Sequence, residues 1–239
     1  MFDASTLPSD PVVSYHEYGF AVVKVYTDEQ AKILDDFAKK WINDLLTDWF
    51  TDEKQPNSLE SYHIWSRGLP EAHRDVFKAL NRYRYPDQAL ESVLINDRLK
   101  SFLSAIGLNQ YKYWDDGWGW IGFRFIRPGA SDGYPFTRKA WGVSEDVVSC
   151  WVPIIGHSSK ETLTIVPGSH KKQYENCPDT GKFSKNEYRL ATPPQDNELY
   201  NPTLQTGEII FYHPETIHSE DVLDSDKTRL SLEFRFKPY

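Results

Sequence analysis

The spacing of apolar residues changes near the middle of the chain. In the first half they recur every three or four positions, the spacing of a helix with one buried face, in three stretches: TDEQAKILDDFAKKWINDLL (27–46), LPEAHRDVFKALNRY (69–83) and DQALESVLINDRLKSFLSAIG (87–107). Thr27, with Gln30 three positions later, predicts a capping box at the start of the first helix. The glycine at position 107 predicts the C-terminal cap of the third helix.

Short runs of β-branched and aromatic residues predict strands. One run precedes the helices, and the others fill the second half: YGFAVVKVY (18–26), WGWIGFRFIRPG (118–129), VVSCWVPII (147–155), TLTIVPGSH (162–170), GEIIFYH (207–213) and RLSLEFRF (229–236). The last run alternates between apolar and polar residues, so its polar face holds Arg229, Ser231, Glu233 and Arg235. Such a strand suits either a sheet with one face in water or a barrel whose polar face lines a cavity. We favour the cavity.

The order of the elements, helices first and strands last, predicts one domain of the α+β, mainly β class over residues 1–239. Residues 1–110 are expected to form an N-terminal strand and a helical buttress, and residues 111–239 a sandwich or barrel. A polar, proline-bearing stretch at about residues 174–202 predicts a surface loop or lid within the second part.

Composition excludes several classes of protein. The chain has 239 residues, of which 39% are hydrophobic and 15% aromatic, enough for a sizeable core. No apolar run approaches the roughly 20 residues of a membrane span, and the N-terminus lacks the pattern of a signal peptide. The two cysteines fit neither a disulfide framework nor a zinc site. We therefore expect a cytoplasmic protein, and the net charge of −8 argues against nucleic acid as a partner.

Three stretches resemble the phytanoyl-CoA dioxygenase family. YGFAVVKVYTDEQAKIL (18–34) is similar to its N-terminal strand and helix, LTIVPGSHK (163–171) to its mid-domain turn, and GEIIFYHPETIHSEDVLDSDKTRLSLEFRF (207–236) to its C-terminal strand pair. The resemblance implies a double-stranded β-helix, which is a jelly-roll, cupin-like barrel, buttressed by N-terminal helices. It also implies the chemistry of the Fe(II)/2-oxoglutarate oxygenase superfamily, in which Fe(II), 2-oxoglutarate and oxygen hydroxylate a substrate.

In that family a His-x-Asp pair and a distal histidine hold iron, and an arginine binds the far carboxylate of 2-oxoglutarate. His218 matches the distal histidine, and Arg229, 11 positions later, matches the arginine. The pair falls on YPFTRKAWG (134–142), where Thr137 stands at the histidine position and Lys139 at the carboxylate position. A lysine ammonium there would oppose Fe(II) by about 1 to 4 kcal/mol. Two of the three ligands that the resemblance implies are thus replaced.

Other residues could rebuild a metal site with His218. Asp132, His157, Glu161 and His213 fall in or near loops that could reach the cavity, although none has the His-x-Asp spacing. The sequence HRD (73–75) has that spacing, but it lies in a predicted helix of the first half, so we treat the match as coincidence.

The sequence leaves three functions open. The favoured one is a family relative with a degenerate iron site that binds, or acts without metal on, a small anionic molecule in the inherited cavity. In this interpretation Arg229 and Ser231 hold the anion, and Lys139, Thr137 and His218 line the former metal position, with Lys139 able to act as an acid–base group.

The second function is an active hydroxylase that uses Fe(II) and 2-oxoglutarate through His218 and either His157 or Asp132. The third is a non-enzymatic interaction module that keeps only the fold. The residues specify neither the substrate nor the oligomeric state.

Overall fold

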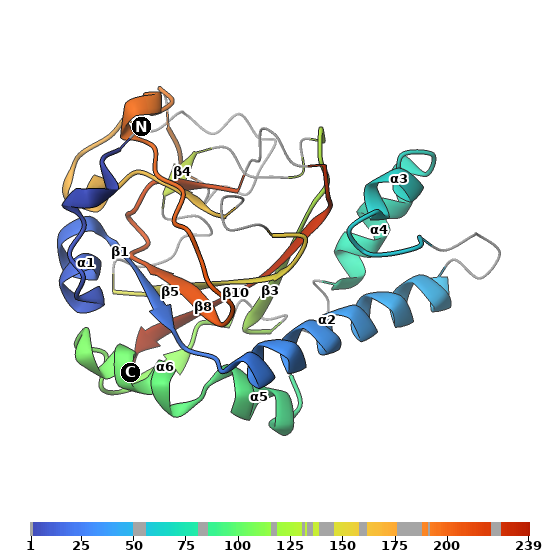
Figure 1. The fold of residues 1–239 in the computed structure, drawn as a ribbon, viewed down its shortest axis with the longest axis horizontal. Coiled ribbons are helices and arrows are strands. Elements are labelled where there is room, and N and C mark those ends of the chain that lie inside the picture. Colours follow the sequence, from blue (N-terminus) through green and yellow to red (C-terminus); the bar gives the residue numbers. More distant parts are fainter. Residues whose placement is uncertain are drawn as a thin grey trace.

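The computed structural model describes residues 2–49, 56–80, 86–115, 119–130, 132, 136–138, 146–157, 162–175, 188–190, 192–220 and 226–239. Within these residues the chain forms two antiparallel sheets and a layer of helices. Figure 1 shows the larger sheet across the middle of the molecule, with α2, α5 and α6 on one side of it and β4 on the other.

The larger sheet contains six strands, all paired antiparallel: β1 (Phe20–Lys24), β2 (Tyr111–Tyr113), β3 (Ile121–Ile126), β5 (Val148–Ile155), β8 (Glu208–Tyr212) and β10 (Arg229–Pro238). Its order is β1-β8-β5-β10, and β10 pairs on its other side with β3 and then with β2. The N-terminal strand thus pairs with a strand almost 200 positions later, so the two ends of the chain share one sheet.

The smaller sheet is built from strands of two residues each: β4 (Thr137–Arg138), β6 (Thr164–Ile165), β7 (Tyr188–Arg189) and β9 (His218–Ser219). Its order is β6-β9-β4-β7. Because β7 pairs with β4, the predicted loop at residues 174–202 supplies a strand and a short 3-10 helix, η4 (Asp196–Glu198), in its described part. The stretch 176–187 lies outside the described residues.

The helices are α1 (Pro11–Tyr18), α2 (Asp28–Trp49), α3 (Tyr62–Ser66), α4 (Pro70–Leu80), α5 (Gln88–Leu94) and α6 (Asp97–Ala105), with further 3-10 turns at η1 (Ala4–Thr6) and η3 (Ser169–Lys171). The predicted capping box of α2 is confirmed, because Thr27 N donates to Gln30 Oε1 and Gln30 N donates to Thr27 Oγ1. The single helix expected over 87–107 is wrong. Asn96 divides it, and its side chain caps α6 by accepting from the backbone N–H groups of Arg98 and Leu99.

The two faces of β10 meet different surroundings. Leu230, Leu232, Phe234 and Phe236 are buried in the core between the large sheet and the helices, where Ile42 of α2 and Leu103 of α6 also lie. On the opposite face Arg229, Ser231 and Glu233 are 3–5% exposed. The predicted alternation is confirmed, and the polar face is buried rather than exposed to solvent.

The structure supports a mixed α/β fold with antiparallel sheets, and the described strands do not close into a barrel. Within the described residues, no helix combines the length and the apolar character needed to span a bilayer.

Candidate functional site

Thr137 and His218 lie opposite each other in the smaller sheet. β4 and β9 pair antiparallel with the Cα atoms of these two residues in register. Directly opposed residues on neighbouring strands point their side chains to the same face. The residue at the expected histidine position of the His-x-Asp pair is therefore a neighbour of the distal histidine, and it is buried, at 1% exposure.

His218 is held in one orientation and kept neutral by its surroundings. Its Nδ1 lies 2.8 Å from the carbonyl oxygen of Thr216, which can only accept, so Nδ1 carries the proton and Nε2 the lone pair. The centroid of its ring lies 4.7 Å from the centroid of the Tyr212 ring. Burial lowers the pKa of His218; Glu233 acts against this, and the positive charges of Arg235 and Arg124 add to it.

Glu233 of β10 is the centre of a buried ion network. Its Oε2 accepts from Arg124 Nε at 3.0 Å and Nη2 at 2.7 Å, and its Oε1 accepts from Arg235 Nη2 and from the Tyr212 hydroxyl, both at 2.5 Å. Burial alone would raise the pKa of this carboxyl, but Arg235, Arg124 and the Tyr212 hydroxyl outweigh it and hold the pKa well below its usual range. Glu233 is therefore a fixed anion whose charge is already used by two arginines.

Glu220 follows β9 and is also buried, at 8% exposure. Its Oε2 lies 3.4 Å from Arg124 Nε, and its backbone oxygen accepts from Arg229 Nη2 at 2.8 Å. Burial raises the pKa of the carboxyl to about 7, although Arg124 favours the charged form. No described residue gives Glu220 Oε2 a hydrogen bond.

A small cavity of about 10 Å³, with room for about one water molecule, lies between the polar face of the large sheet and the residues around β6 and β9. Apolar walls come from Ile126, Trp151 and Leu163. Polar walls come from His157, Thr162, Glu220, Arg229 and Ser231. The structure thus brings His157 together with Arg229 and Ser231, the pair that the sequence analysis assigns to the anion.

His157 and Asp132 are both committed to contacts with protein groups. His157 Nε2 lies 2.8 Å from the carbonyl oxygen of Leu230, and its ring meets that of Trp151 edge-on. Asp132 accepts from Arg127 at both oxygens, from Nε at 2.7 Å and Nη2 at 2.9 Å, and also from the Arg127 backbone N–H. Burial acts against the charged form of Asp132, but Arg127 and His73 more than compensate, so its pKa is below its usual range.

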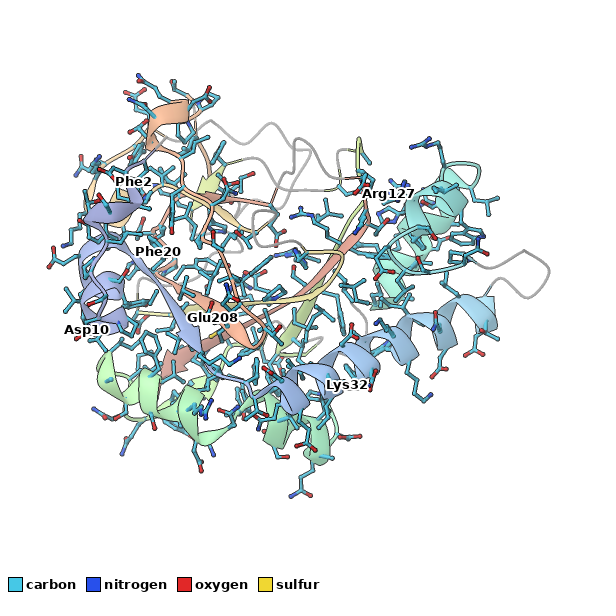
Figure 2. All side chains as sticks on the ribbon, in the orientation of Figure 1. Phe2, Asp10, Phe20, Lys32, Arg127 and Glu208 are labelled. Carbon is cyan, nitrogen blue, oxygen red and sulfur yellow. The ribbon has the colours of Figure 1, made fainter. Side chains whose placement is uncertain are left out.

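The histidine of the HRD sequence, His73, belongs to this same cluster. Its Nε2 lies 3.4 Å from Asp132 Oδ1 and its Nδ1 lies 3.3 Å from the Tyr62 hydroxyl. Figure 2 shows Arg127 at the end of the large sheet nearest to α3 and α4. The cluster therefore ties these two helices to the strand end.

His213 takes part in local structure at the end of β8. Its Nδ1 accepts from the Glu215 backbone N–H at 3.2 Å, and its own backbone N–H donates to the Gly19 carbonyl oxygen. Lys139 and Glu161 lie outside the described residues.

The described residues do not fit an iron ion. No three histidine, cysteine, aspartate or glutamate side chains among them gather into a group that could hold a metal. His218 faces Thr137, which is not an iron ligand, and the buried carboxylate that acts on its pKa, Glu233, is engaged by two arginines. A facial triad of two histidines and one carboxylate is absent from this part of the chain.

Sequence reasoning missed Arg124, Tyr212 and Glu220 as members of the site. Arg124 could have been found from the alternation of the run 118–129, where it shares a face with Gly122 and Ile126 and opposes Phe123 and Phe125. Glu220 lies two positions after His218, just past the end of β9, so the two side chains are expected on the same face. Tyr212 gave no signal distinct from an ordinary core aromatic.

No family model and no curated protein matches the sequence. Solved structures do match the fold. The non-heme monooxygenase ThoJ is 12% identical with a TM-score of 0.60, covering 96% of this chain and 77% of its own. The epimerase SnoN, in complex with Fe3+, alpha ketoglutarate and nogalamycin RO, is 14% identical with a TM-score of 0.57, covering 95% and 82%.

A third match is EctD from S. alaskensis with 2-oxoglutarate and 5-hydroxyectoine, at 12% identity and a TM-score of 0.57, covering 97% of this chain and 76% of EctD. The chain shares its fold with these non-heme iron and 2-oxoglutarate proteins. At such identities the likeness concerns the fold alone.

Proposed function

We propose that this chain binds a small carboxylate between its two sheets without a metal ion, as a member of the phytanoyl-CoA dioxygenase family whose iron site has degenerated. In this proposal the fold is the double-stranded β-helix of that family. The observation that carries the proposal is the pairing of His218 with Thr137, because a threonine stands where the fold would need its second metal ligand.

The charges around the polar face favour an anion. Arg124, Arg229 and Arg235 lie near the buried carboxylates Glu220 and Glu233 in the described part of the interior. Three guanidinium groups close together attract an anion.

Arg229 is the proposed anchor. It begins β10, is 3% exposed, and lines the cavity together with Ser231. A guanidinium carries its N–H donors in a planar fork that matches a carboxylate, and Arg229 Nη2 also donates to the Glu220 carbonyl oxygen. The cavity of about 10 Å³ is far below the roughly 300–1,000 Å³ of drug-sized sites, so its walls must move apart to admit even a small ligand.

Thr137 and His218 are proposed to face the other end of the ligand. By the resemblance, Lys139 is placed there too, where its ammonium would supply the charge that iron supplies in the family. If the protein is an enzyme, these three residues and the lone pair on His218 Nε2 are the groups available for proton transfer.

Metal binding is tested by anaerobic titration of the purified protein with Fe(II), with and without 2-oxoglutarate, followed by calorimetry and by visible absorption. We expect no mutually dependent binding and no charge-transfer band. If iron and 2-oxoglutarate each strengthen binding of the other and the band appears, the protein is an iron hydroxylase with other ligands, and the metal-independent proposal is wrong.

Anion binding is tested by ligand-observed NMR with a panel of C3–C5 mono- and dicarboxylates in the presence of EDTA. We expect binding that is lost in Arg229→Met and weakened in Arg229→Lys, because lysine keeps the charge without the fork. Arg98→Ala, at an exposed arginine of α6, is the control and should bind normally. Circular dichroism establishes that the variants are folded. Binding that survives Arg229→Met would remove Arg229 as the anchor.

A further inference from the structure

A groove of about 400 Å³ lies between the first two turns of α2 and the end of β5. The segment 204–207, which leads into β8, forms its third wall. His157 and Thr162 line both this groove and the small cavity beside Arg229, so they separate the two. Small-molecule sites occupy about 300–1,000 Å³. The groove is therefore large enough for a small ligand as it stands.

The groove follows an opening in the large sheet. β5 pairs with β8 only from Ser149 to Trp151, whereas on its other side it pairs with β10 as far as Ile155. Among the described strands, the end of β5 thus has one neighbour instead of two. Pro153 lies in this stretch and lines the groove. Because a proline has no N–H, its backbone offers an acceptor and no donor.

Other groups on the walls are also acceptors. Asp28 and Asp35 contribute carboxylates. The Thr162 hydroxyl donates its proton to a backbone carbonyl oxygen, so towards a ligand it can only accept. Lys32 lines the groove too, but its ammonium is paired with Asp36, 2.5 Å away on the next residue row of α2. The groove therefore suits a ligand that is rich in N–H donors.

The two carboxylates are spaced along one face of α2. Seven residues separate Asp28 from Asp35, which places them about 10 Å apart along the helix axis. Ala31 lies between them on the same face, and Ile154 and Leu204 add apolar surface to the groove. An apolar strip with an acceptor near each end matches a chain of methylene groups that carries a cation at each end.

Each carboxylate already has a lysine neighbour four positions away. Lys24 Nζ lies 3.1 Å from Asp28 Oδ1, and Lys39 Nζ lies 2.7 Å from Asp35 Oδ2. Each contact uses one oxygen, so the second oxygen of each carboxylate can accept from a ligand. Exposed pairs of this kind contribute little to stability, so rearranging them to admit a ligand costs little.

We propose that this groove binds a linear diamine, with one ammonium group on Asp28 and the other on Asp35. The methylene chain lies over Ala31, Ile154 and Leu204. A chain of about seven methylene groups spans the distance between the two carboxylates. The net charge of −8 favours the approach of such a dication.

The test compares amines of different length and charge. Dissociation constants are measured by ligand-observed NMR at pH 7.5 for 1,7-diaminoheptane, 1,3-diaminopropane and heptylamine. We expect 1,7-diaminoheptane to bind about tenfold more tightly than either of the others, because only it reaches both carboxylates while its chain covers the apolar strip. Heptane-1,7-diol, which has the same length and no charge, should not bind.

Variants locate the site. Asp28→Asn and Asp35→Asn keep the size of each side chain and should each weaken 1,7-diaminoheptane to about the level of heptylamine. Ala31→Gln fills the strip between them without a charge and should also weaken binding. Asp44→Asn is the matched control, because Asp44 is an exposed carboxylate of α2 that is likewise paired with a lysine four positions away. It should bind normally, and circular dichroism establishes that all four variants are folded.

Three results would overturn the inference. Absence of binding by 1,7-diaminoheptane would remove the site. Equal binding of the long diamine, the short diamine and heptylamine would show that the two carboxylates do not act together. Binding that weakens as much in Asp44→Asn as in Asp28→Asn and Asp35→Asn would show a general attraction of cations to an acidic protein.

Discussion

Thr137 on β4 and His218 on β9 face each other as register partners in a sheet whose strands are two residues long. Neither strand stands out in the hydrophobic pattern. The resemblance to a known family assigned both positions to one site, and the sheet pairing is what makes them neighbours. Their chemistry is that of one imidazole and one hydroxyl, which suits a hydrogen-bonded ligand better than a divalent ion.

Glu233→Gln should destabilise the protein strongly. The change leaves Arg124 and Arg235 buried without their shared counter-charge, and breaking a buried ion pair from one side costs about 3–5 kcal/mol. Urea denaturation gives the change in the free energy of unfolding. Tyr212→Phe removes one hydrogen bond to the same carboxylate and should cost only about 1–2 kcal/mol. A loss for Glu233→Gln no larger than that for Tyr212→Phe would contradict the role of Glu233 as the centre of the network.

Gly156→Ala should be far more damaging than Gly129→Ala, although the two glycines have nearly the same φ, +70° and +68°. At Gly129 an added Cβ meets nothing within 4 Å, so only the left-handed backbone matters, at about 1–2 kcal/mol. At Gly156 the Cβ would lie 2.0 Å from the Thr228 carbonyl oxygen, so the backbone beside Arg229 must move.

Thermal unfolding of the two alanine variants measures the difference directly. Carboxylate binding offers a second readout, because a shift of Thr228 should disturb Arg229 and weaken binding in Gly156→Ala alone. Equal melting temperatures for the two variants would show that the close approach of Gly156 to Thr228 is not kept in solution.

Asp132→Asn should make the free energy of unfolding depend less on pH in the acid range. Arg127 and His73 hold the pKa of Asp132 below its usual value of 3.8, so the unfolded chain takes up a proton at a higher pH than the folded one does. The stability that Asp132 contributes is therefore complete above its usual pKa and is lost as the pH falls toward the lower, folded-state value. The groups that face it are Arg127, His73 and, through His73, Tyr62.

The measurement is the free energy of unfolding from about pH 7 down to pH 2, for the wild type and Asp132→Asn. The variant should be less stable at neutral pH, and the difference between the two should shrink on acidification. A difference that stays constant across this range would mean that Asp132 is not held as a buried anion.

Cys150 should react with thiol reagents only when the protein unfolds. It is fully buried among apolar residues of the core, and this burial raises the pKa of its thiol well above the usual value. In a Cys177→Ser variant, labelling by Ellman's reagent should be negligible under native conditions and should follow the unfolding curve in urea. Rapid labelling of the folded variant would place Cys150 nearer to solvent than the structure does.

The sequence was most informative where a local pattern decides the structure. The alternation of β10 separated core from cavity residues, and the capping box located the start of α2. It was less informative where a contact depends on pairing between distant segments. Arg124 reaches Glu233 because Ser231, two positions earlier, is its register partner across β3 and β10, and no local pattern predicts this offset.

The same limit explains the remaining differences. A polar residue inside an otherwise helical pattern is typical of a surface position, so the pattern gives no sign of the break at Asn96, which depends on its capping bonds. Asp132 is a loop residue whose partners come from the neighbouring strand end and from α4, which only the tertiary structure brings together. The contacts of Arg124 and Asp132 thus depend on strand and helix packing between segments that are distant in the sequence.

The arginines around Glu233 also affect how a metal could bind beside His218. A divalent ion there would lie within the field of Arg124 and Arg235, whose positive charges already act on that imidazole. Removing either arginine would disrupt Glu233, which both of them hold. Under the proposed function, a return to iron therefore requires several coordinated substitutions rather than one.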